Sequence, residues 1–576
     1  MPTLNWIGKD KVVNHHLDVP FRVLEEQYAF GDNADGNMII HGDNLDALKA
    51  LLPQFEGKVK CIYIDPPYNT GNEGWVYNDN VNDPKIRKWL GEVVGREGED
   101  LSRHDKWLCM MYPRLKLLQK LLAEDGVIFI SIDDTEYANL KAICDEIFGL
   151  NCFVSNISWQ RTYSTRNDSK GIVNEVEHIL VYSKVQDWQP KKLPRTAEMD
   201  EKYSNPDNDY MPWTSSDAFA ADAATHQGMV YAIQHPFTGE LIYPYNNAHW
   251  RYSQDEMLEH MRGWCPYELQ YIHDEERRAS ICGVSVENIR NDVKAIVLSQ
   301  SVKESEKTAS SVYKRGQWPK FYFTKRGKGG IRRKTYLDNV GGKPPTNFWP
   351  YIEAGHTDEA SKEVNSIFNG KVRFDTPKPS RLIEYILRIV GDKNAIILDS
   401  FAGSGTTAHA VLNMNKQDGG NRRFILVETE DYAESITAER VRRVITGYGE
   451  GKKAVEGTGG GFSFYELGAP LMIDGNLNPD VPEARIREYV YYTETKLPMP
   501  PISEDEPHLL GVNNRAAYYF YYLPDAVTTL NEAFLRTIRT PAESYMVYAD
   551  INALDDETMK KHGITFKKIP RDITLL

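Results

Sequence analysis

Strand-length apolar runs that alternate with helical patterns constrain the fold of this chain more than any other feature. Four of these runs are apolar at nearly every position: VKCIYI (59–64), VIFISI (127–132), AIILD (395–399) and RFILVE (423–428). Strands of this composition are buried on both faces, as in parallel sheets that helices cover on each side. Helical patterns, such as residues 45–52 and 380–390, separate the runs. The pattern predicts an α/β fold around a parallel sheet.

The chain is expected to divide into about two to four domains, because 576 residues exceed one ordinary core. A first block of strands and helices falls within residues 1–190, and a second falls within residues 346–450. Between them, residues 191–345 are rich in Tyr, Trp, Asn and Pro and lose the alternation, which indicates an inserted domain. The stretch GKKAVEGTGGGF after Tyr448 predicts a linker to a small C-terminal domain over residues 455–576.

Composition narrows the class of protein. With 41% apolar and 26% charged residues, the chain resembles soluble globular proteins. It shows neither a signal peptide nor an apolar stretch that could span a bilayer, so we expect a cytoplasmic protein without a membrane partner. The six cysteines form no CxxC pairs, which predicts neither a zinc site nor a disulfide framework. Because the net charge is −14, any contact with nucleic acid must come from a local basic patch.

A glycine-rich turn, DSFAGSGTT, follows the buried strand that ends at Asp399. Strand, glycine turn and helix units let a ligand approach the backbone closely, and three nucleotide ligands remain open. A phosphate-binding P-loop would need lysine where Thr406 stands, and a dinucleotide fingerprint would accept Ala408 as its third small residue. The third ligand is S-adenosylmethionine, whose methionine part lies over a D-x-F-x-G-x-G turn. A tight turn without a ligand is the structural alternative.

Glu428 strengthens the nucleotide interpretation. It ends the next strand, where an acidic residue can accept both ribose hydroxyls of an adenosine. The alternative is a glutamate at a solvent-exposed strand end. The predicted cofactor-binding residues of this region are Asp399, Phe401, Ala402, Gly403, Gly405, Thr406 and Glu428.

A second motif, Asp65-Pro66-Pro67-Tyr68, follows the strand over residues 59–64. Two successive prolines carry no N–H group, so carbonyl oxygens face the site as acceptors. Asp65 and the Pro66 carbonyl can accept both protons of one amine, and Tyr68 offers a flat face for an aromatic ring. We therefore predict that Asp65, Pro66, Pro67 and Tyr68 are catalytic residues that bind the exocyclic amino group of a base.

The chemistry of adenine explains this arrangement. Its amino nitrogen is a weak nucleophile because the lone pair is delocalised into the ring. Hydrogen bonds from both amine protons would localise the pair and favour the positive charge that develops during attack on a methyl sulfonium. A base in a duplex must be flipped out at a cost of roughly a few kcal/mol. Stacking on Tyr68, worth about 1 to 3 kcal/mol, would offset much of this cost.

At these residues the chain resembles the β-class DNA amino-methyltransferases, in which D-P-P-Y precedes F-x-G-x-G and an insertion lies between them. The strings IDPPYNTGNEGWVYND, HGDNLDALKALL and FDTPKPSRLIEYILRI are similar to modification subunits of type III restriction-modification systems and their orphan relatives. The resemblance implies a Rossmann-like S-adenosylmethionine-dependent methyltransferase fold with permuted motif order. It also implies an inserted target-recognition domain and S-adenosylmethionine as the cofactor.

The resemblance implies further site residues and partners. It places Asp43 near the adenine ring of the cofactor and Lys378 at its methionine end, with Asp65 facing the cofactor as well. A helix cap for Asp43 and a solvated side chain for Lys378 are the structural alternatives. The loop over residues 69–79 is expected to close over the site. The implied partners are double-stranded DNA, a second copy of the chain and, unless the chain is an orphan relative, a separate restriction subunit.

One segment is strongly basic in this acidic chain. No acidic residue occurs from Tyr313 to Lys334, and glycines there would allow close approach to phosphate. The predicted DNA contacts are Lys314, Arg315, Lys320, Lys325, Arg326, Lys328, Arg332, Arg333 and Lys334. A solvated charged face is the alternative. The resemblance assigns residues 234–253 to the recognition domain.

The sequence thus predicts a site-specific DNA methyltransferase that acts on the 6-amino group of a flipped-out adenine. Methylation of the cytosine 4-amino group remains open, because that amine also has two protons, although S-P-P-Y is the commoner motif there. A catalytically silent DNA-binding or scaffold subunit is the alternative from another class. The intact Asp65, Tyr68, Gly403, Gly405 and Glu428 argue against a silent subunit.

Overall fold

The computed structural model describes residues 3–32, 34, 36–70, 100–163 and 172–571. The chain divides into two units, one of Met1–Lys191 with Pro345–Leu576 and one of Lys192–Pro344. The second unit spans nearly the same residues as the expected insertion, and its role in recognition stays a prediction. Within the described ranges, no helix is both long and apolar enough to cross a membrane.

A ten-stranded sheet forms the centre of the larger unit. Its strand order is β1 (Arg22–Gly31), β21 (Gly461–Pro470), β2 (Met38–His41), β18 (Arg423–Glu428), β17 (Ile396–Asp399), β3 (Val59–Ile64), β4 (Leu122–Ile132), β6 (Val176–Ser183), β5 (Phe153–Gln160) and β16 (Phe348–Trp349). Neighbours from β21 to β4 run parallel. The predicted α/β class is confirmed. The prediction that the sheet is parallel is wrong for its outer strands, because β6 runs antiparallel to β4 and β5, and β1 runs antiparallel to β21.

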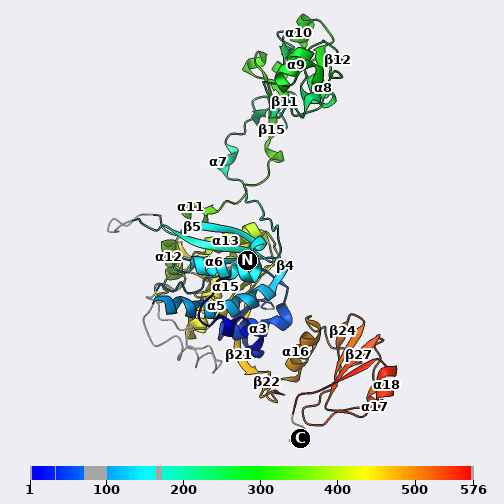
Figure 1. The fold of residues 1–576 in the computed structure, drawn as a ribbon. Helices are drawn as coiled ribbons and strands as arrows, with labels where there is room; N and C mark the ends of the chain where they lie inside the picture. Colours follow the sequence, from blue (N-terminus) through cyan, green and yellow to red (C-terminus); the bar gives the residue numbers. More distant parts are fainter. Residues whose placement is uncertain (1–2, 33, 35, 71–99, 164–171, 572–576) are drawn as a thin grey trace. The chain divides into compact units, whose positions relative to one another are not determined.

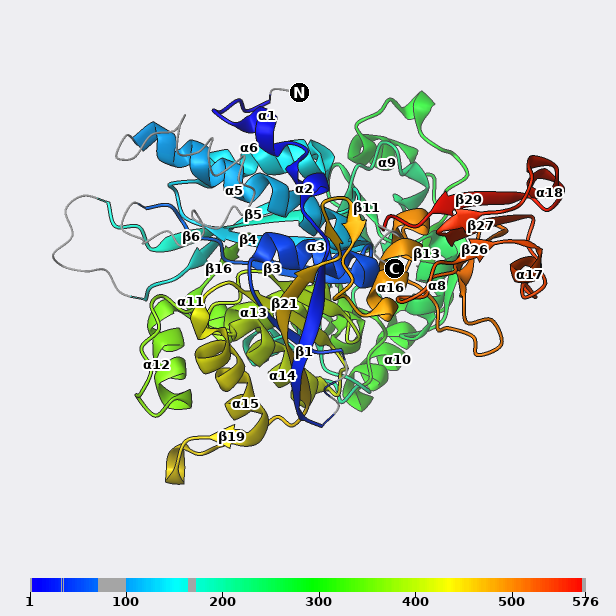
Figure 2. The same cartoon turned by 90° about the horizontal axis from the view of Figure 1, so that it is seen from below.

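Helices cover both faces of this sheet. Figure 2 shows α5 and α6 on one side of β4, β5 and β6, and α12 to α15 on the other side. Strands β3 and β4 are buried nearly throughout between these layers, which explains their apolar sequences. The helices of the larger unit around the sheet include α1 (Lys9–Val12), α2 (His15–Asp18), α3 (Asn44–Phe55), α5 (Asp100–Leu121), α6 (Tyr137–Phe148), α11 (Tyr351–Ala354), α12 (Thr357–Ile367), α13 (Ser380–Val390), α14 (Thr406–Asp418) and α15 (Glu439–Thr446).

The glycine-rich stretch after Tyr448 is not an interdomain linker. It leads into β21, which joins the central sheet between β1 and β2. The sheet therefore continues to Pro470, and the expected boundary between residues 450 and 455 is wrong. The glycines serve close backbone contact: Gly31 has a φ of +77°, and a Cβ there would lie 2.3 Å from the Gly460 carbonyl oxygen.

Residues beyond Pro470 form a small α/β arrangement (Figure 1). Its four-stranded sheet has the order β24 (Leu509–Asn513), β25 (Ala516–Phe520), β27 (Ser544–Ala549) and β29 (Ile564–Lys568). Its helices include α16 (Glu483–Thr495), α17 (Glu532–Leu535) and α18 (Asp556–Lys561). A separate core of buried Leu530, Phe534 and Val547 holds the sheet to α17.

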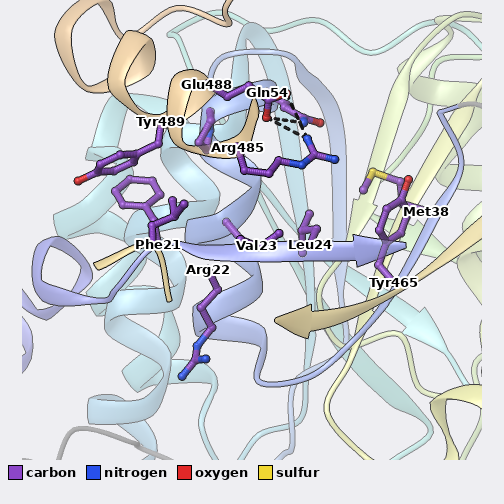
Figure 3. A pocket seen from close by; sticks show the side chains of 13 residues that line it. Phe21, Arg22, Val23, Leu24, Met38, Gln54, Tyr465, Arg485, Glu488 and Tyr489 are labelled. Carbon is purple, nitrogen blue, oxygen red and sulfur yellow. Dashed lines mark hydrogen bonds and ion pairs between the residues drawn. The ribbon is translucent and has the colours of Figure 1, made fainter. Parts of the chain in front are cut away.

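Helix α16 packs on α3 and on the start of β1. The Phe21 and Tyr489 rings lie 5.0 Å apart between their centroids. Arg485 and Gln54 both donate to the Glu488 carboxylate, at 2.9 and 3.4 Å (Figure 3). The cavity between these elements measures about 60 Å³. That volume suits a few waters and is far below the roughly 300 Å³ of small-molecule sites, so we interpret the cavity as a packing gap.

The second unit has an aromatic core of its own. Trp250, Trp264 and Phe321 are fully buried, so the Tyr- and Trp-rich composition serves packing. One sheet has the order β10 (Leu241–Ile242), β9 (Ile233–Gln234), β13 (Ala295–Leu298) and β12 (Tyr267–Gln270), and another has β14 (Phe321–Phe323), β15 (Ile331–Tyr336) and β7 (Trp213–Asp217). Its helices include α7 (Ala197–Asp200), α8 (Gln254–Arg262), α9 (Glu275–Cys282) and α10 (Val302–Arg315).

Candidate active site

The two sequence motifs meet at the carboxyl edge of the central sheet. Strand β3 ends just before Asp65 and β17 ends at Asp399, and the two strands are neighbours with Ile62 opposite Leu398. The chain continues from β17 to β18 on one side and from β3 to β4 on the other, so the connections reverse direction between β3 and β17. Ligands of open α/β sheets bind outside the strand ends at such a switch point. This edge is therefore the candidate site.

Asp65, Tyr68 and Lys378 form a compact hydrogen-bonded cluster there. The Lys378 ammonium donates to the two Asp65 oxygens at 2.8 and 2.7 Å and to the Tyr68 hydroxyl oxygen at 2.9 Å. The Tyr68 hydroxyl also lies 2.9 Å from Asp65 Oδ1. Lys378 directly precedes Pro379, the N-cap of α13, and is only 9% exposed. The solvated alternative for Lys378 is therefore wrong, and its direct partner is the predicted catalytic carboxylate.

Glu177 and Arg161 complete this cluster, and the sequence analysis missed both. Glu177 lies at the start of β6, which reaches the same edge because β6 runs antiparallel to β4. Its Oε2 atom lies 3.1 Å from the Tyr68 hydroxyl and 3.6 Å from Lys378 Nζ. Its Oε1 atom accepts from Arg161 at 2.8 Å. The sequence signal that could have found it is a glutamate at the head of the apolar run EHILVYS.

The charged side chains of this cluster shift one another's pKa values. Burial raises the pKa of the Asp65 carboxyl, and the adjacent Lys378 charge opposes that shift. Burial by itself would lower the pKa of Lys378, but the negative charges of Asp65 and Glu177 outweigh it and raise this pKa. The lysine therefore stays charged, and it stabilises Asp65 as a carboxylate that can accept hydrogen bonds.

Bonds from neighbouring helices fix the backbone of the D-P-P-Y motif. The fully buried Trp107 of α5 donates its indole N–H to the Pro67 carbonyl at 2.7 Å. Asn69 has a positive φ of 62°, and its amide donates to the buried Glu136. Both contacts hold the segment that carries Pro66 in one conformation. Of the loop expected to close over the site, residues 71–79 lie outside the described residues.

The glycine turn after β17 is shaped by two positive φ values. Gly403 has a φ of 52° and Gly405 has one of 84°. A Cβ on Gly405 would lie 3.1 Å from the Thr437 carbonyl oxygen, and the Thr437 hydroxyl donates to the Gly403 carbonyl at 2.6 Å. Thr437 belongs to a π-helical turn, Glu434–Ala438, that precedes α15. The turn is thus held from outside, and its predicted members Phe401 and Ala402 are buried.

Two buried carboxyls flank this turn. Glu428 is 1% exposed and accepts the Gly403 N–H at 2.7 Å and two further backbone N–H groups at 3.0 Å each. Asp399 accepts the Phe401 N–H at 3.1 Å and the Thr407 hydroxyl at 2.5 Å. Burial raises the pKa of each carboxyl to about 7. The exposed alternative for Glu428 is therefore wrong.

A buried arginine that the sequence analysis did not single out supports the turn. Arg440 of α15 donates to the Ser404 and Thr406 hydroxyls at 2.7 and 2.9 Å and to Glu363 at 2.9 Å. The Thr406 hydroxyl in turn donates to the Lys378 carbonyl at 3.2 Å. Thr406 thus joins the glycine turn to the segment that carries Lys378.

Asp43 follows β2, the neighbour of the strand that carries Glu428. Its carboxylate accepts the Leu45 and Asp46 N–H groups at 2.8 and 3.3 Å, which makes it the N-cap of α3. The buried Arg114 lies 3.4 Å from its second oxygen. The helix-cap alternative for Asp43 is therefore present in the structure, and its cofactor contact stays a prediction.

The basic segment of the second unit divides by exposure. Its exposed members are Lys314, Arg315, Lys325, Arg326 and Lys328, and its partly buried members are Lys320, Arg332 and Arg333. Lys320 donates to the Tyr252 hydroxyl at 2.7 Å, and Arg332 pairs with Asp217.

Lys334 does not belong to this surface. Its side chain is 0% exposed and donates to Asp207 and Asp209 at 2.5 Å each and to the Trp318 carbonyl at 2.7 Å. All three ammonium hydrogens have partners inside the protein. The predicted phosphate contact of Lys334 is therefore wrong, and this lysine holds the core of its unit together.

Fold and site together define an α/β protein in which the Asp65–Lys378 pair and a glycine turn follow neighbouring strands at the switch point of the sheet. The model of the N6/N4 family described as DNA methylase matches residues 59–439. The chain therefore belongs to this DNA methylase family, as the resemblance implied.

The names of similar proteins agree with this family. It is 33% identical over 439 residues to the type III restriction-modification enzyme StyLTI Mod subunit of Salmonella typhimurium, covering 73% of this chain and 57% of that subunit. It is 29% identical to the type II methyltransferase M.KpnI of Klebsiella pneumoniae, covering 69% and 81%. The solved PvuII DNA methyltransferase (cytosine-N4-specific) is similar at 12% identity over 72% of this chain and 89% of that chain, with a TM-score of 0.32. The chain thus spans less than two thirds of the StyLTI Mod subunit.

Proposed function

We propose that the chain is a site-specific DNA methyltransferase that moves the methyl group of S-adenosylmethionine to the 6-amino group of a flipped-out adenine. The observation that carries the proposal is the position of Asp65 and Tyr68 at the switch point, with Gly403 in the turn after the adjoining β17 and Glu428 at the end of β18. The proposed acceptors for the amine and the proposed binding site for an adenosine-containing cofactor therefore lie at the same edge of the central sheet. Membership in the DNA methylase family supports the same class of reaction.

The residues of the glycine turn fit the proposed cofactor. A Cβ on Gly403 would lie 3.4 Å from the Phe374 ring, so glycine keeps the backbone there open to the methionine part of a ligand. Glu428 presents its carboxylate at a strand end, where ribose hydroxyls can donate to it. Asp43, at the end of the adjoining strand, is the proposed neighbour of the adenine ring. When bound, the cofactor supplies an electrophilic methyl group on a sulfonium.

The chain itself orients and activates the amine. Asp65 and the Pro66 carbonyl accept its two protons, which directs the nitrogen lone pair toward the methyl group and stabilises the developing positive charge. The Tyr68 ring stacks on the extruded base. Because burial raises the pKa of Asp65, this carboxylate can also take the proton that the methylated amine releases. No covalent intermediate with the chain is required.

Cofactor affinity is expected to fall as the pH drops through about 7. Burial raises the pKa of Glu428 to about 7, and only its ionised form accepts both ribose hydroxyls. Calorimetric titration of S-adenosylmethionine at about pH 6, 7 and 8 would measure the change. Glu428→Gln should bind weakly and with little pH dependence, and an affinity of the unmodified protein that is flat over this range would contradict the role.

The same pKa shift acts on folding stability in the opposite direction. In the ligand-free protein, the stability that protonated Glu428 contributes is lost as the pH rises through about 7.

The second unit is the proposed DNA reader, and its exposed cations support this role. Lys328→Ala is expected to weaken binding about equally for all duplex sequences, because a phosphate contact positions DNA without reading bases. The slope of log affinity against log salt should fall by about one unit. Fluorescence anisotropy over a salt series measures both effects. Lys11→Ala removes an exposed lysine from α1 and is the matched control; equal effects in the two variants would count against the patch.

Names of relatives suggest the partners. Some of the relatives are Mod subunits of type III restriction-modification enzymes. Their names support a separate restriction subunit as a partner of this chain. The resemblance further supports a homodimer, and the cytoplasmic location stays an expectation from the sequence. Sedimentation of the purified chain with and without duplex DNA would test the dimer.

Product analysis tests the proposed reaction. The protein is incubated with methyl-labelled cofactor and duplex DNA, which is then digested to nucleosides. N6-methyladenine supports the proposal, N4-methylcytosine would replace adenine by the cytosine alternative, and the absence of label in DNA would favour a silent DNA-binding subunit. Sequencing methylated DNA from cells that express the protein would give the recognition sequence.

A further inference from the structure

We infer that Glu177 is a positioning residue that takes over the hydrogen bonds of Tyr68 and Lys378 when the substrate amine reaches Asp65. This inference rests on the proposed function and deepens it. It concerns a residue outside both sequence motifs, which reaches the site only because β6 is antiparallel to its neighbour β4.

Such a residue is useful because the Asp65 carboxylate already accepts hydrogen bonds from other side chains. Both of its carboxylate oxygens accept from the Lys378 ammonium, and Oδ1 also lies 2.9 Å from the Tyr68 hydroxyl. The proposed reaction needs the same carboxylate to accept a proton of the substrate amine in an activating geometry. The present donors compete with the amine for the negative charge of Asp65, so we expect the arriving amine to displace at least one of them, and a buried donor without a new acceptor would cost about 1 to 3 kcal/mol.

Glu177 is placed to accept both displaced donors. Its Oε2 atom already lies 3.1 Å from the Tyr68 hydroxyl, which can donate to only one carboxylate at a time. The same oxygen lies 3.6 Å from Lys378 Nζ, so a small movement of the ammonium would complete the second bond. Both donors can thus change partners without leaving the cluster.

Arg161 orients the Glu177 carboxylate for this role. Its guanidinium donates to Glu177 Oε1 at 2.8 Å and leaves Oε2 facing Tyr68 and Lys378. The four charged groups, Asp65, Glu177, Lys378 and Arg161, are formally balanced. A neutral cluster lets the ammonium move between two carboxylates with little change in electrostatic energy, whereas a single carboxylate would hold it in place.

The test compares Glu177→Gln with Glu177→Asp and with Glu175→Gln, which removes the same charge two residues earlier. Steady-state kcat and KM for DNA are measured at saturating cofactor, together with the single-turnover rate of methyl transfer. Because misplaced reacting groups can cost up to about 10²-fold, we expect Glu177→Gln to lower kcat by roughly 10- to 100-fold. KM for DNA and Kd for the cofactor should stay within about threefold, and Glu177→Asp should recover part of the rate because it keeps the charge.

The pH profile supplies a second readout that a merely structural role would not move. The groups that face Asp65 are Lys378, Tyr68, Tyr63, Asp399 and Glu177, and the negative charge of Glu177 raises the pKa of Asp65. Glu177→Gln retains the other four groups. The acidic limb of the rate profile should therefore shift to lower pH even though the plateau falls.

The outcomes separate this inference from the proposed function. A reduced plateau together with a shifted acidic limb supports the inference. A Glu177→Gln rate equal to that of the unmodified protein, or a loss that merely follows the folded fraction or DNA binding, would overturn it while leaving the proposed methyltransferase intact. An unmodified protein that transfers no methyl group to any base would reject both.

Discussion

Asp65→Ala is expected to lower the rate of methyl transfer by roughly 10²- to 10³-fold, the range seen when one preorganised electrostatic contact to a transition state is removed. The physical reason is that the amine loses the acceptor that localises its lone pair and stabilises its developing charge. Lys378 keeps a nearby negative partner, because Glu177 Oε2 lies 3.6 Å from its ammonium. Cofactor affinity should therefore change by no more than a few-fold. Single-turnover transfer and calorimetric binding measure the two quantities separately.

Asp134→Ala is the matched control for this experiment. Asp134 follows β4 at the same edge of the sheet, but its side chain is 68% exposed and pairs with His178 and Asn174. Its removal should leave transfer within about twofold, since surface ion pairs contribute about 0 to 1 kcal/mol. Equal rates for Asp65→Ala and the unmodified protein would remove Asp65 from the mechanism.

Lys334→Ala is expected to destabilise the second unit by about 3 to 5 kcal/mol, the usual cost of leaving a buried charge without its partner. The side chain of Asp207 has no exposed surface, and the lysine is shared with Asp209 and the Trp318 carbonyl. The loss of DNA binding should therefore follow unfolding. Denaturant unfolding followed by tryptophan fluorescence would report the change, because Trp213 and Trp318 lie beside the ion pair.

Lys303→Ala provides the control, since Lys303 is an exposed residue of the same unit on α10. Its effect on the free energy of unfolding should stay within about 0.5 kcal/mol. A Lys334→Ala variant that keeps full stability and loses only DNA affinity would restore the phosphate contact that the sequence suggested.

Short-range patterns explain which parts of the candidate site were predictable. Asp65 and Tyr68 follow an apolar strand directly, and Gly403 and Gly405 occupy a turn with positive φ values. Each of these features is encoded within a few consecutive residues. Glu177, Arg161 and Arg440 were not predictable in this way, because each reaches the site from a separate element through side-chain contacts.

The error at Lys334 has a related cause. A run of cations in the sequence looks uniform, but the exposure of each side chain depends on what packs against it in the folded unit. Arg332 and Arg333 are partly exposed on β15, whereas Lys334 meets two aspartates from another part of the unit. The glycine-rich stretch after Tyr448 misled for a similar reason, since its pairing partners β1 and β2 lie at the other end of the chain.

By itself, the sequence determined the α/β class, the two motifs and the order in which they occur, because buried strands, tight turns and prolines leave local patterns. Tertiary structure alone decided that β3 and β17 are neighbours, that β6 brings Glu177 to their edge and that β21 lies between β1 and β2. Strand order and side-chain contacts depend on long-range packing, which no short stretch of sequence specifies.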